Sequence, residues 1–414
     1  MHTLRTPRIE YSYSRVIIVL CCLMVLFSGC SDVFGNGTSS SVRTSHTRTK
    51  ADANGTQTNA VLRTQLTKVQ QIIDGMTLEQ KLGQLIIVEY IGTDYPDTAL
   101  PYMVSQQYVG GYLYQAKNSN FDPPSDTVSS AARIAVQANQ DAKIPLLIAI
   151  DEEGGQVNKL SSFYGAMPSA AQMAATGDPK NAQAQGVQAA KWMQSLGINA
   201  DLAPVIDVGP TSNLLEDRQF SDDPQTVATY AGAFLNGLQH NSIIGTLKHF
   251  PGLGSLPDSK NYDPHDALPV VNKSKTDLES VDWLPYKTLI QHNHPAMIMS
   301  TDVVDTSIDP NFPAELSPKM INGVLRGELG YNGVIITDGL YMGGIQAQWS
   351  IAQASVLAII AGNDLVEGAF HAQDVASTIE GLKSAITQGQ LSMQQVNNSL
   401  QRILLMKMQY GVIK

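Results

Sequence analysis

Eight short apolar runs recur along the chain, with segments of helical periodicity between most of them, and this alternation constrains the fold more than any other feature. "QLIIVEYI" and "IPLLIAI" are typical of the runs. Continuous apolar strands separated by helices indicate a parallel sheet that is covered on its faces. The expected strands are 84–91, 109–114, 144–150, 198–206, 243–248, 296–303, 333–337 and 363–366.

Segments of helical periodicity follow the second, third, fourth and fifth expected strands, and two more close the chain. Eight strand–helix units in about 350 residues predict an α/β fold, a (β/α)8 TIM-type barrel, rather than an open doubly wound sheet. No Gly-rich dinucleotide or phosphate-loop motif follows the first strand, which also argues against a nucleotide-binding fold. The expected helices are 129–142, 180–196, 223–240 and 276–292, with C-terminal helices at 372–388 and 391–410.

The N-terminus is typical of a secretory signal. Three arginines precede the apolar run 16–27, and small residues and Cys30 follow it. Twelve apolar residues are too few to cross a bilayer, which needs about 20. The letters "FSGC" that end at Cys30 resemble a bacterial lipoprotein signal, in which the cysteine is lipidated. We therefore expect residues 1–29 to be a signal peptide and Cys30 to carry a lipid.

The composition after Cys30 separates a tether from one folded domain. Residues 30–60 are rich in Ser, Thr, Asn and Gly, which indicates a flexible tether, and residues 61–414 form the expected barrel domain. The formal net charge is −10 and no basic run occurs, which argues against nucleic acid and against electrostatic membrane binding. We expect an extracytoplasmic monomer that contacts the membrane only through its lipid anchor.

Polar residues follow six of the expected strands. In a barrel of this type all carboxyl ends of the strands face one rim, where such enzymes place their active sites. One such residue is usually only a loop charge, but six strand ends together predict an acidic pocket. The residues are Asp151, Glu152 and Glu153 after the third strand, Asp207, Asp217 and Arg218 after the fourth, Lys248 and His249 at the fifth, and Asp302, Asp338 and Glu367 after the sixth, seventh and eighth.

Several of these stretches together resemble one protein family. They are "AIDEEGGQVNKL", "LGINADLAPVIDV", "EDRQFSDDP", "KHFPG" and "LRGELGYNGVIITDGLYMGGI", in the family's order. Over residues 65–412 the chain resembles the single-domain bacterial β-N-acetylhexosaminidases of glycoside hydrolase family three. The resemblance implies a retaining, exo-acting enzyme that removes terminal β-N-acetylglucosamine from cell-wall or chitin-like oligosaccharides. It implies no cofactor and no metal, and the sequence has no clustered His/Cys pattern.

The resemblance also implies two catalytic groups. Asp338 corresponds to the nucleophile. The family's proton donor is the histidine of an Asp-x-His pair on the loop after the fifth strand, but a gap-free alignment puts Asp258-Ser259-Lys260 there. The pair Asp263 and His265 follows, and "DALPVV" comes after it as Leu-Pro does in the family. Loops absorb insertions at little cost, so we expect an insertion in this loop and assign the proton transfer to His265, oriented by Asp263.

The remaining motif residues are implied to bind the sugar. Asp151 would accept hydrogen bonds from ring hydroxyls, and Arg218, Lys248 and His249 would donate them. Lys159 stands where the family has an arginine, so the charge is kept and the forked geometry is lost. The plainer alternatives are that His249 is a satisfied strand-end histidine and that His265 is a solvent-exposed loop residue.

Three other functions fit the same sequence. Two alternatives have the same fold: β-glucosidase activity and glycoside phosphorylase activity. In a different class the chain would be a catalytically silent, sugar-binding lipoprotein, because Leu253 replaces the histidine of the family's Gly-His-Gly and the loop is altered.

Overall fold

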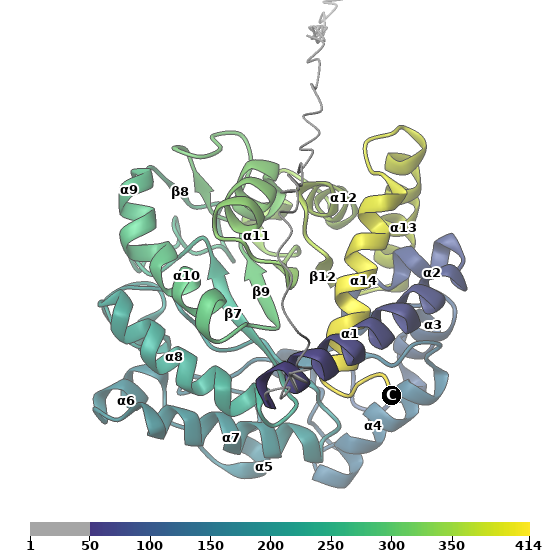
Figure 1. Ribbon diagram of the computed structural model, residues 1–414, viewed down its shortest axis with the longest axis horizontal. Coiled ribbons are helices and arrows are strands. Elements are labelled where there is room, and N and C mark those ends of the chain that lie inside the picture. Colours follow the sequence, from purple (N-terminus) through teal and green to yellow (C-terminus); the bar gives the residue numbers. More distant parts are fainter. Residues whose placement is uncertain (1–49) are drawn as a thin grey trace, which may run out of the picture. The chain divides into compact units, whose positions relative to one another are not determined.

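Eight parallel strands close into a barrel, in which each strand pairs with the next along the chain and β1 pairs with β12. The computed structural model describes residues 50–414. Within them all eight expected strands and the (β/α)8 architecture are confirmed (Figure 1). The barrel strands are β1 (Ile86–Glu89), β2 (Gly111–Tyr114), β3 (Leu147–Ile150), β6 (Ala200–Asp201), β7 (Ile244–Phe250), β9 (Met297–Ser300), β11 (Val334–Gly339) and β12 (Leu365–Ala369).

Helices surround this barrel, and the expected ones are present within a few residues of their predicted bounds (Figure 1). The α-helices are α1 (Lys50–Asp74), α2 (Leu78–Gly83), α3 (Leu100–Ser105), α4 (Val128–Asp141), α5 (Ser161–Tyr164), α6 (Ala170–Ala175), α7 (Pro179–Ser195), α8 (Pro224–Gln239), α9 (Lys275–Asp277), α10 (Trp283–His292), α11 (Gly343–Gln346), α12 (Ile351–Ala361), α13 (Ala372–Thr387) and α14 (Met393–Gln409). The other helical turns are η1 (Tyr95–Asp97), η2 (Ala116–Asn118), η3 (Glu216–Arg218), η4 (Leu278–Asp282), η5 (Ala314–Leu316) and η6 (Lys319–Glu328).

Local sequence signals start several of these helices. Asp178 and Asp223 accept hydrogen bonds from the backbone N–H groups of Lys180 and Thr226, at the starts of α7 and α8. Each aspartate is followed by a proline at the first helical position, where the missing N–H costs nothing. These caps explain why the periodicity located both helices closely.

The structure has an N-terminal helix, α1, that the sequence analysis did not predict. α1 starts at Lys50, inside the stretch 30–60 that the composition assigns to a flexible tether. Its C-terminal half buries Val69 and Ile73 in the core, and a helix nucleated there extends backwards at little cost because propagation is easier than nucleation. The expected signal peptide, Cys30 and the first part of the tether lie outside the described residues. None of the helices in residues 50–414 is long and apolar enough to cross a membrane.

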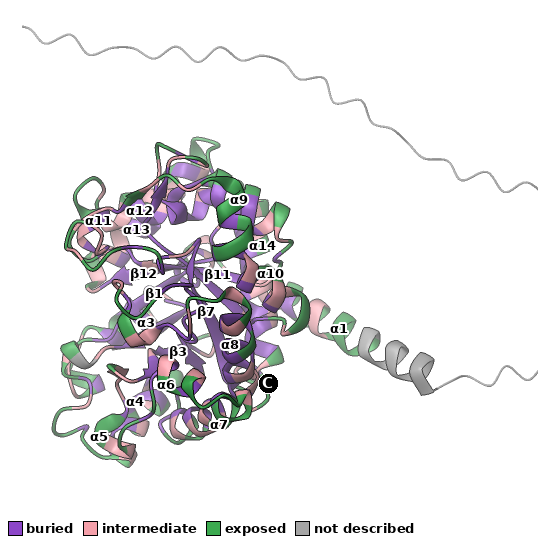
Figure 2. Cartoon of the chain, turned by 90° about the vertical axis from the view of Figure 1, so that its left-hand side faces the viewer, coloured by how far each residue is buried: buried purple, intermediate pink, exposed green. Residues whose placement is uncertain are grey.

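The two ends of the barrel differ in what they hold. The strands of the barrel are almost entirely buried, whereas the helices alternate buried and exposed positions (Figure 2). At the amino ends of the strands, Asp364 accepts hydrogen bonds from Arg326 and Arg402. The buried Lys407 of α14 donates to the carbonyls of Gly110 and Pro145, at 2.8 and 2.9 Å. The polar residues predicted for the rim lie at the opposite, carboxyl ends.

Two small sheets belong to the loops at those carboxyl ends. β4 (Glu152–Gly154) and β5 (Val157–Asn158) form an antiparallel hairpin directly after β3. β8 (Val270–Val271) and β10 (Val304–Asp305) form a short parallel pair, which ties the loop after β7 to the loop after β9. Both sheets give shape to loops that would otherwise be irregular.

Candidate active site

A cavity of about 780 Å³ opens at the carboxyl ends of the strands. All eight residues to which the sequence assigns catalysis or sugar binding line it. They are Asp151, Lys159, Arg218, Lys248, His249, Asp263, His265 and Asp338. The strand-end pattern therefore located a real cavity, and the structure brings the whole predicted set together there.

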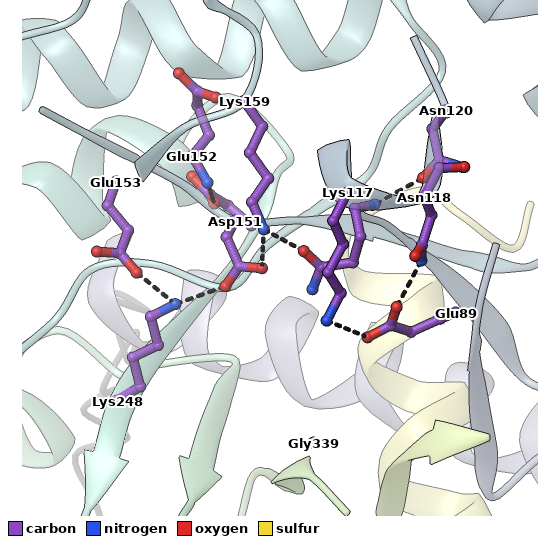
Figure 3. Close-up of polar contacts among 12 residues, drawn as sticks. Glu89, Lys117, Asn118, Asn120, Asp151, Glu152, Glu153, Lys159, Lys248 and Gly339 are labelled. Carbon is purple, nitrogen blue, oxygen red and sulfur yellow. Dashed lines mark hydrogen bonds and ion pairs between the residues drawn. The ribbon is translucent and has the colours of Figure 1, made fainter. Parts of the chain in front are cut away.

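Ion pairs organise one side of the cavity around a buried lysine. Nζ of Lys248 lies 2.6 Å from Oδ1 of Asp151 and 2.7 Å from Oε1 of Glu153. Lys159 approaches the other oxygen of Asp151 at 3.1 Å, and Arg218 binds Glu153 with two nitrogens, at 2.8 and 2.9 Å. Figure 3 shows Lys248 between the two carboxylates and Lys159 on the far side of Asp151. Each carboxylate is held by two cations.

These contacts fix the charges of the network. Burial by itself would raise the pKa of Asp151, but Lys159 and Lys248 outweigh it and hold that pKa well below its usual range. In the same way Arg218 and Lys248 overcome the effect of burial and lower the pKa of Glu153 to about 2. With three cations and two carboxylates, this wall presents fixed, ordered charges to a polar ligand.

His249 is oriented by a carboxylate that the sequence analysis left without a role. Nδ1 of His249 and Oδ2 of Asp207 are 2.7 Å apart, and the backbone N–H of His249 donates to the same oxygen at 3.1 Å. Oδ1 of Asp207 accepts from the backbone N–H of Leu253 at 2.6 Å. Nε2 of His249 has no hydrogen-bond partner in the part of the chain that the structure describes, so it is free for a ligand in the cavity. His249 and Asp207 both lie at strand ends where the sequence analysis had noted polar residues.

Asp338 stands near the end of β11 and is held by two donors. Oδ2 accepts from the hydroxyl of Thr301 at 2.8 Å, and Oδ1 accepts from the N–H of Gly339 at 2.8 Å. The N–H of Asp338 donates to Glu315, which is fully buried. Burial above all, and then neighbouring carboxylates that include Asp338, raise the pKa values of Glu315 and Asp302 well above their usual range.

The loop after β7 brings Asp263 and His265 to the same cavity. Nδ1 of His265 lies 2.8 Å from Oδ1 of Asp263, and the imidazole side chain is 66% exposed. Asp258 and Lys260, the pair that the gap-free alignment favours, are exposed and are not among the residues that line the cavity. The structure therefore places Asp263 and His265 in the same cavity as Asp338 and leaves Lys260 outside its lining.

Two glycines after Asp338 fasten this loop. The N–H of Gly343 donates to the carbonyl of His265 at 3.0 Å, and the N–H of Gly344 donates to the carbonyl of Pro264 at 3.1 Å. A Cβ on Gly343 would lie only 2.5 Å from that same oxygen of His265. The segment that follows Asp338 thus touches the loop that carries His265, and only glycine fits at this contact.

Some residues of the site had no usable signal in the sequence. Thr301 directly follows β9 and Glu315 lies in the short turn η5, and both contact Asp338 although neither belongs to a sequence motif. Asp207 and Glu153 were visible as strand-end acids, but their pairing with His249, Arg218 and Lys248 was not. In residues 50–414, no group of three or more His, Cys, Asp or Glu residues has the arrangement of a metal site.

Comparisons with known proteins find relatives over most of the chain. The family model described as "Glycosyl hydrolase family 3 N terminal domain" matches residues 77–406. The beta-hexosaminidase LpqI of Mycobacterium tuberculosis is 31% identical over 336 residues, which cover 79% of this chain and 82% of that protein. An uncharacterized secreted glycosyl hydrolase of Arthroderma benhamiae is 31% identical over 351 residues, which cover 83% of this chain and 97% of the relative.

A solved structure shows the same architecture. It is a glycoside hydrolase family 3 beta-N-acetylglucosaminidase from Paenibacillus sp. str. FPU-7, with a TM-score of 0.76 and 29% sequence identity. The similarity covers 82% of this chain and 63% of that one.

Proposed function

The chain is a glycoside hydrolase that belongs to glycosyl hydrolase family 3, and from this premise we propose that it is a retaining, exo-acting β-N-acetylhexosaminidase. Its substrates are cell-wall or chitin-like oligosaccharides, from which it removes terminal β-N-acetylglucosamine. The observation that carries the proposal is that Asp338 and the Asp263–His265 pair line one cavity with the ion-pair network around Lys248. The names of the relatives, a beta-hexosaminidase and a beta-N-acetylglucosaminidase, support the choice of sugar.

The proposed reaction has two steps. Asp338 attacks the anomeric carbon and forms a covalent glycosyl-enzyme, while His265 gives a proton to the departing oxygen. A water then takes the place of the aglycone, and His265 removes its proton as the glycosyl bond to Asp338 breaks. Histidine suits both steps because its ordinary pKa lies near neutral pH. Asp263, which contacts Nδ1, selects the tautomer and supports the imidazolium.

Sugar binding falls to the charged wall of the cavity. Asp151 remains ionised and accepts hydrogen bonds from ring hydroxyls, while Lys248, Lys159, Arg218 and His249 donate to them. The ion pairs hold these side chains in place before the sugar arrives, which reduces the entropy lost on binding.

We further propose an extracytoplasmic location with a lipid on Cys30. The sequence supports this through its basic, apolar and small-residue succession before Cys30. The word "secreted" in the name of the Arthroderma benhamiae relative agrees with export. We expect the mature enzyme to act as a monomer.

The test compares aryl β-N-acetylglucosaminide with aryl β-glucoside, each with and without phosphate. The proposal predicts faster turnover of the acetamido sugar, free sugar as the product, and no dependence on phosphate. Release of a glycosyl phosphate would identify a phosphorylase, and preference for the glucoside would identify a β-glucosidase. Binding without turnover would identify a sugar-binding protein. Asp338→Ala, which removes the nucleophile, is expected to abolish nearly all activity while the melting temperature stays near that of the wild type.

A further inference from the structure

One buried acidic residue in the cavity takes no part in the ion-pair network or in the proposed chemistry. Glu367 stands on β12 and lines the cavity, although it is only 4% exposed. No donor among residues 50–414 bonds either oxygen of its side chain, and Oε1 is completely buried without a partner. An unsatisfied buried carboxyl group is costly, so a protein that keeps one needs a reason.

The other deep carboxyl groups of the cavity are satisfied by the protein. Asp151 and Glu153 are each held by two cations. Asp338 accepts from a hydroxyl and a backbone N–H, and the more exposed Asp263 pairs with a histidine. Glu367 is the deep carboxyl group of this cavity that still lacks a donor within the described chain.

The surroundings of Glu367 keep it in place and close to Asp338. β12 is the neighbour of β11 in the barrel, and the N–H of Leu340, two residues after Asp338, donates to the backbone carbonyl of Glu367 at 3.0 Å. A Cβ on Gly339 would lie 3.0 Å from Oε2 of Glu367, so a larger residue at position 339 would crowd this carboxyl group.

The nearby polar groups are engaged elsewhere. Glu89, at the end of β1, accepts from Asn118 at 2.6 Å and lies 3.8 Å from Nζ of Lys117 (Figure 3). Lys117 in turn donates to the hydroxyl of Tyr341 at 3.0 Å. Burial first, and then the charges of Glu89 and Asp338, raise the pKa of Glu367 well above its usual range. A neutral carboxylic acid can both donate and accept a hydrogen bond.

We propose that Glu367 hydrogen-bonds a ring substituent of the sugar bound over Asp338 and thereby helps to determine which sugar is accepted. This inference rests on the proposed function, because that function places the anomeric carbon at Asp338. A group beside the nucleophile faces the substituents nearest the anomeric carbon, those on C2 or C6. Their hydroxyl or amide groups supply the partner that the described chain does not.

The test combines variants of Glu367 with substrates that lack one substituent. Glu367→Leu removes hydrogen bonding, and Glu367→Gln keeps it with nearly the same shape. The substrates are aryl β-N-acetylglucosaminide and its 2-deoxy and 6-deoxy relatives. We expect Glu367→Leu to lower kcat/KM for the parent substrate roughly tenfold to a hundredfold, and Glu367→Gln to lower it much less.

The pattern across substrates decides the matter. If Glu367 contacts the substituent directly, Glu367→Leu should not lower kcat/KM for the deoxy substrate that lacks that substituent, because the contact is already absent. An equal loss on all substrates would mean that Glu367 acts only on the structure and would overturn the proposal. If Glu367→Leu does not fold, Glu367→Ala, which also removes hydrogen bonding, answers the same question: a changed ratio between parent and deoxy substrates supports the contact, and an unchanged ratio refutes it.

A binding experiment separates this inference from the proposed function. If the wild type hydrolyses no aryl glycoside, the proposed function fails. Calorimetric binding of N-acetylglucosamine to Asp338→Asn still tests Glu367, because it requires no turnover. Roughly tenfold weaker binding after adding Glu367→Leu supports the contact, and unchanged binding refutes it.

Discussion

Gly343→Ala tests whether the segment after Asp338 positions His265. The added Cβ would lie 2.5 Å from the carbonyl oxygen of His265, whereas real Cβ contacts are essentially never shorter than 3.0 Å and are mostly longer than 3.4 Å. The loop must therefore retreat by about 0.5 to 0.9 Å, and the hydrogen bond from Gly343 to this carbonyl must lengthen or bend. A misplacement of about 1 Å costs an enzyme on the order of a hundredfold in rate, so we expect kcat to fall roughly tenfold to a hundredfold.

The assay measures kcat and kcat/KM on two aryl N-acetylglucosaminides. One has a poor leaving group that needs a proton, and the other is a dinitrophenyl glycoside that does not. Because the shift displaces the proton donor, the loss should be several times larger with the poor leaving group. Gly323→Ala in η6 is the matched control, since its Cβ would meet nothing closer than 4.0 Å. We expect wild-type activity from this control.

Two results would refute this reasoning. Full activity of Gly343→Ala would mean that the loop position is unimportant or adapts freely. An equal loss on both substrates would mean that the substitution disturbs Asp338 or the fold rather than His265. The melting temperature of each variant then distinguishes a disturbed Asp338, which leaves the melting temperature unchanged, from a disturbed fold, which lowers it.

Three further predictions concern other parts of the chain. His265→Ala should reduce turnover of a poor leaving group by roughly a hundredfold or more, whereas Lys260→Ala should have little effect; a harmless His265→Ala would contradict the assignment. Burial lowers the pKa of Lys407 from 10.5 to about 7, so between these pH values the unfolded chain binds a proton that the folded chain does not, and stability rises with pH. Lys407→Met should remove this dependence, so that its melting temperature relative to the wild type falls from pH 7 to pH 10; a constant difference would argue against a neutral Lys407. Cys30→Ser should release the protein from the membrane fraction of cells that make it, and continued membrane association would indicate an uncleaved anchor.

The acid–base loop shows where sequence reasoning reached its limit. Two alignments of the letters after Lys248 were possible, and the choice of Asp263 and His265 over Asp258 and Lys260 depended on a resemblance. The structure sets the first pair at the cavity and the second outside it. Local sequence does not encode which part of a long loop folds back over the barrel, because that depends on contacts with Gly343 and Gly344, far along the chain.

The sequence by itself determined the barrel and the rim. Apolar periodicity is local, and eight parallel strands must bring their carboxyl ends to one side, so Asp151, Lys248 and Asp338 could be expected in one pocket. Only the tertiary structure decided the partners. Lys248 lies between two carboxylates of β3 and its hairpin, Thr301 and Glu315 hold Asp338, and Glu367 is left without a donor in the described chain. These pairings follow from how the closed barrel staggers its strands and packs its loops, and contacts between residues so distant in sequence leave no local pattern.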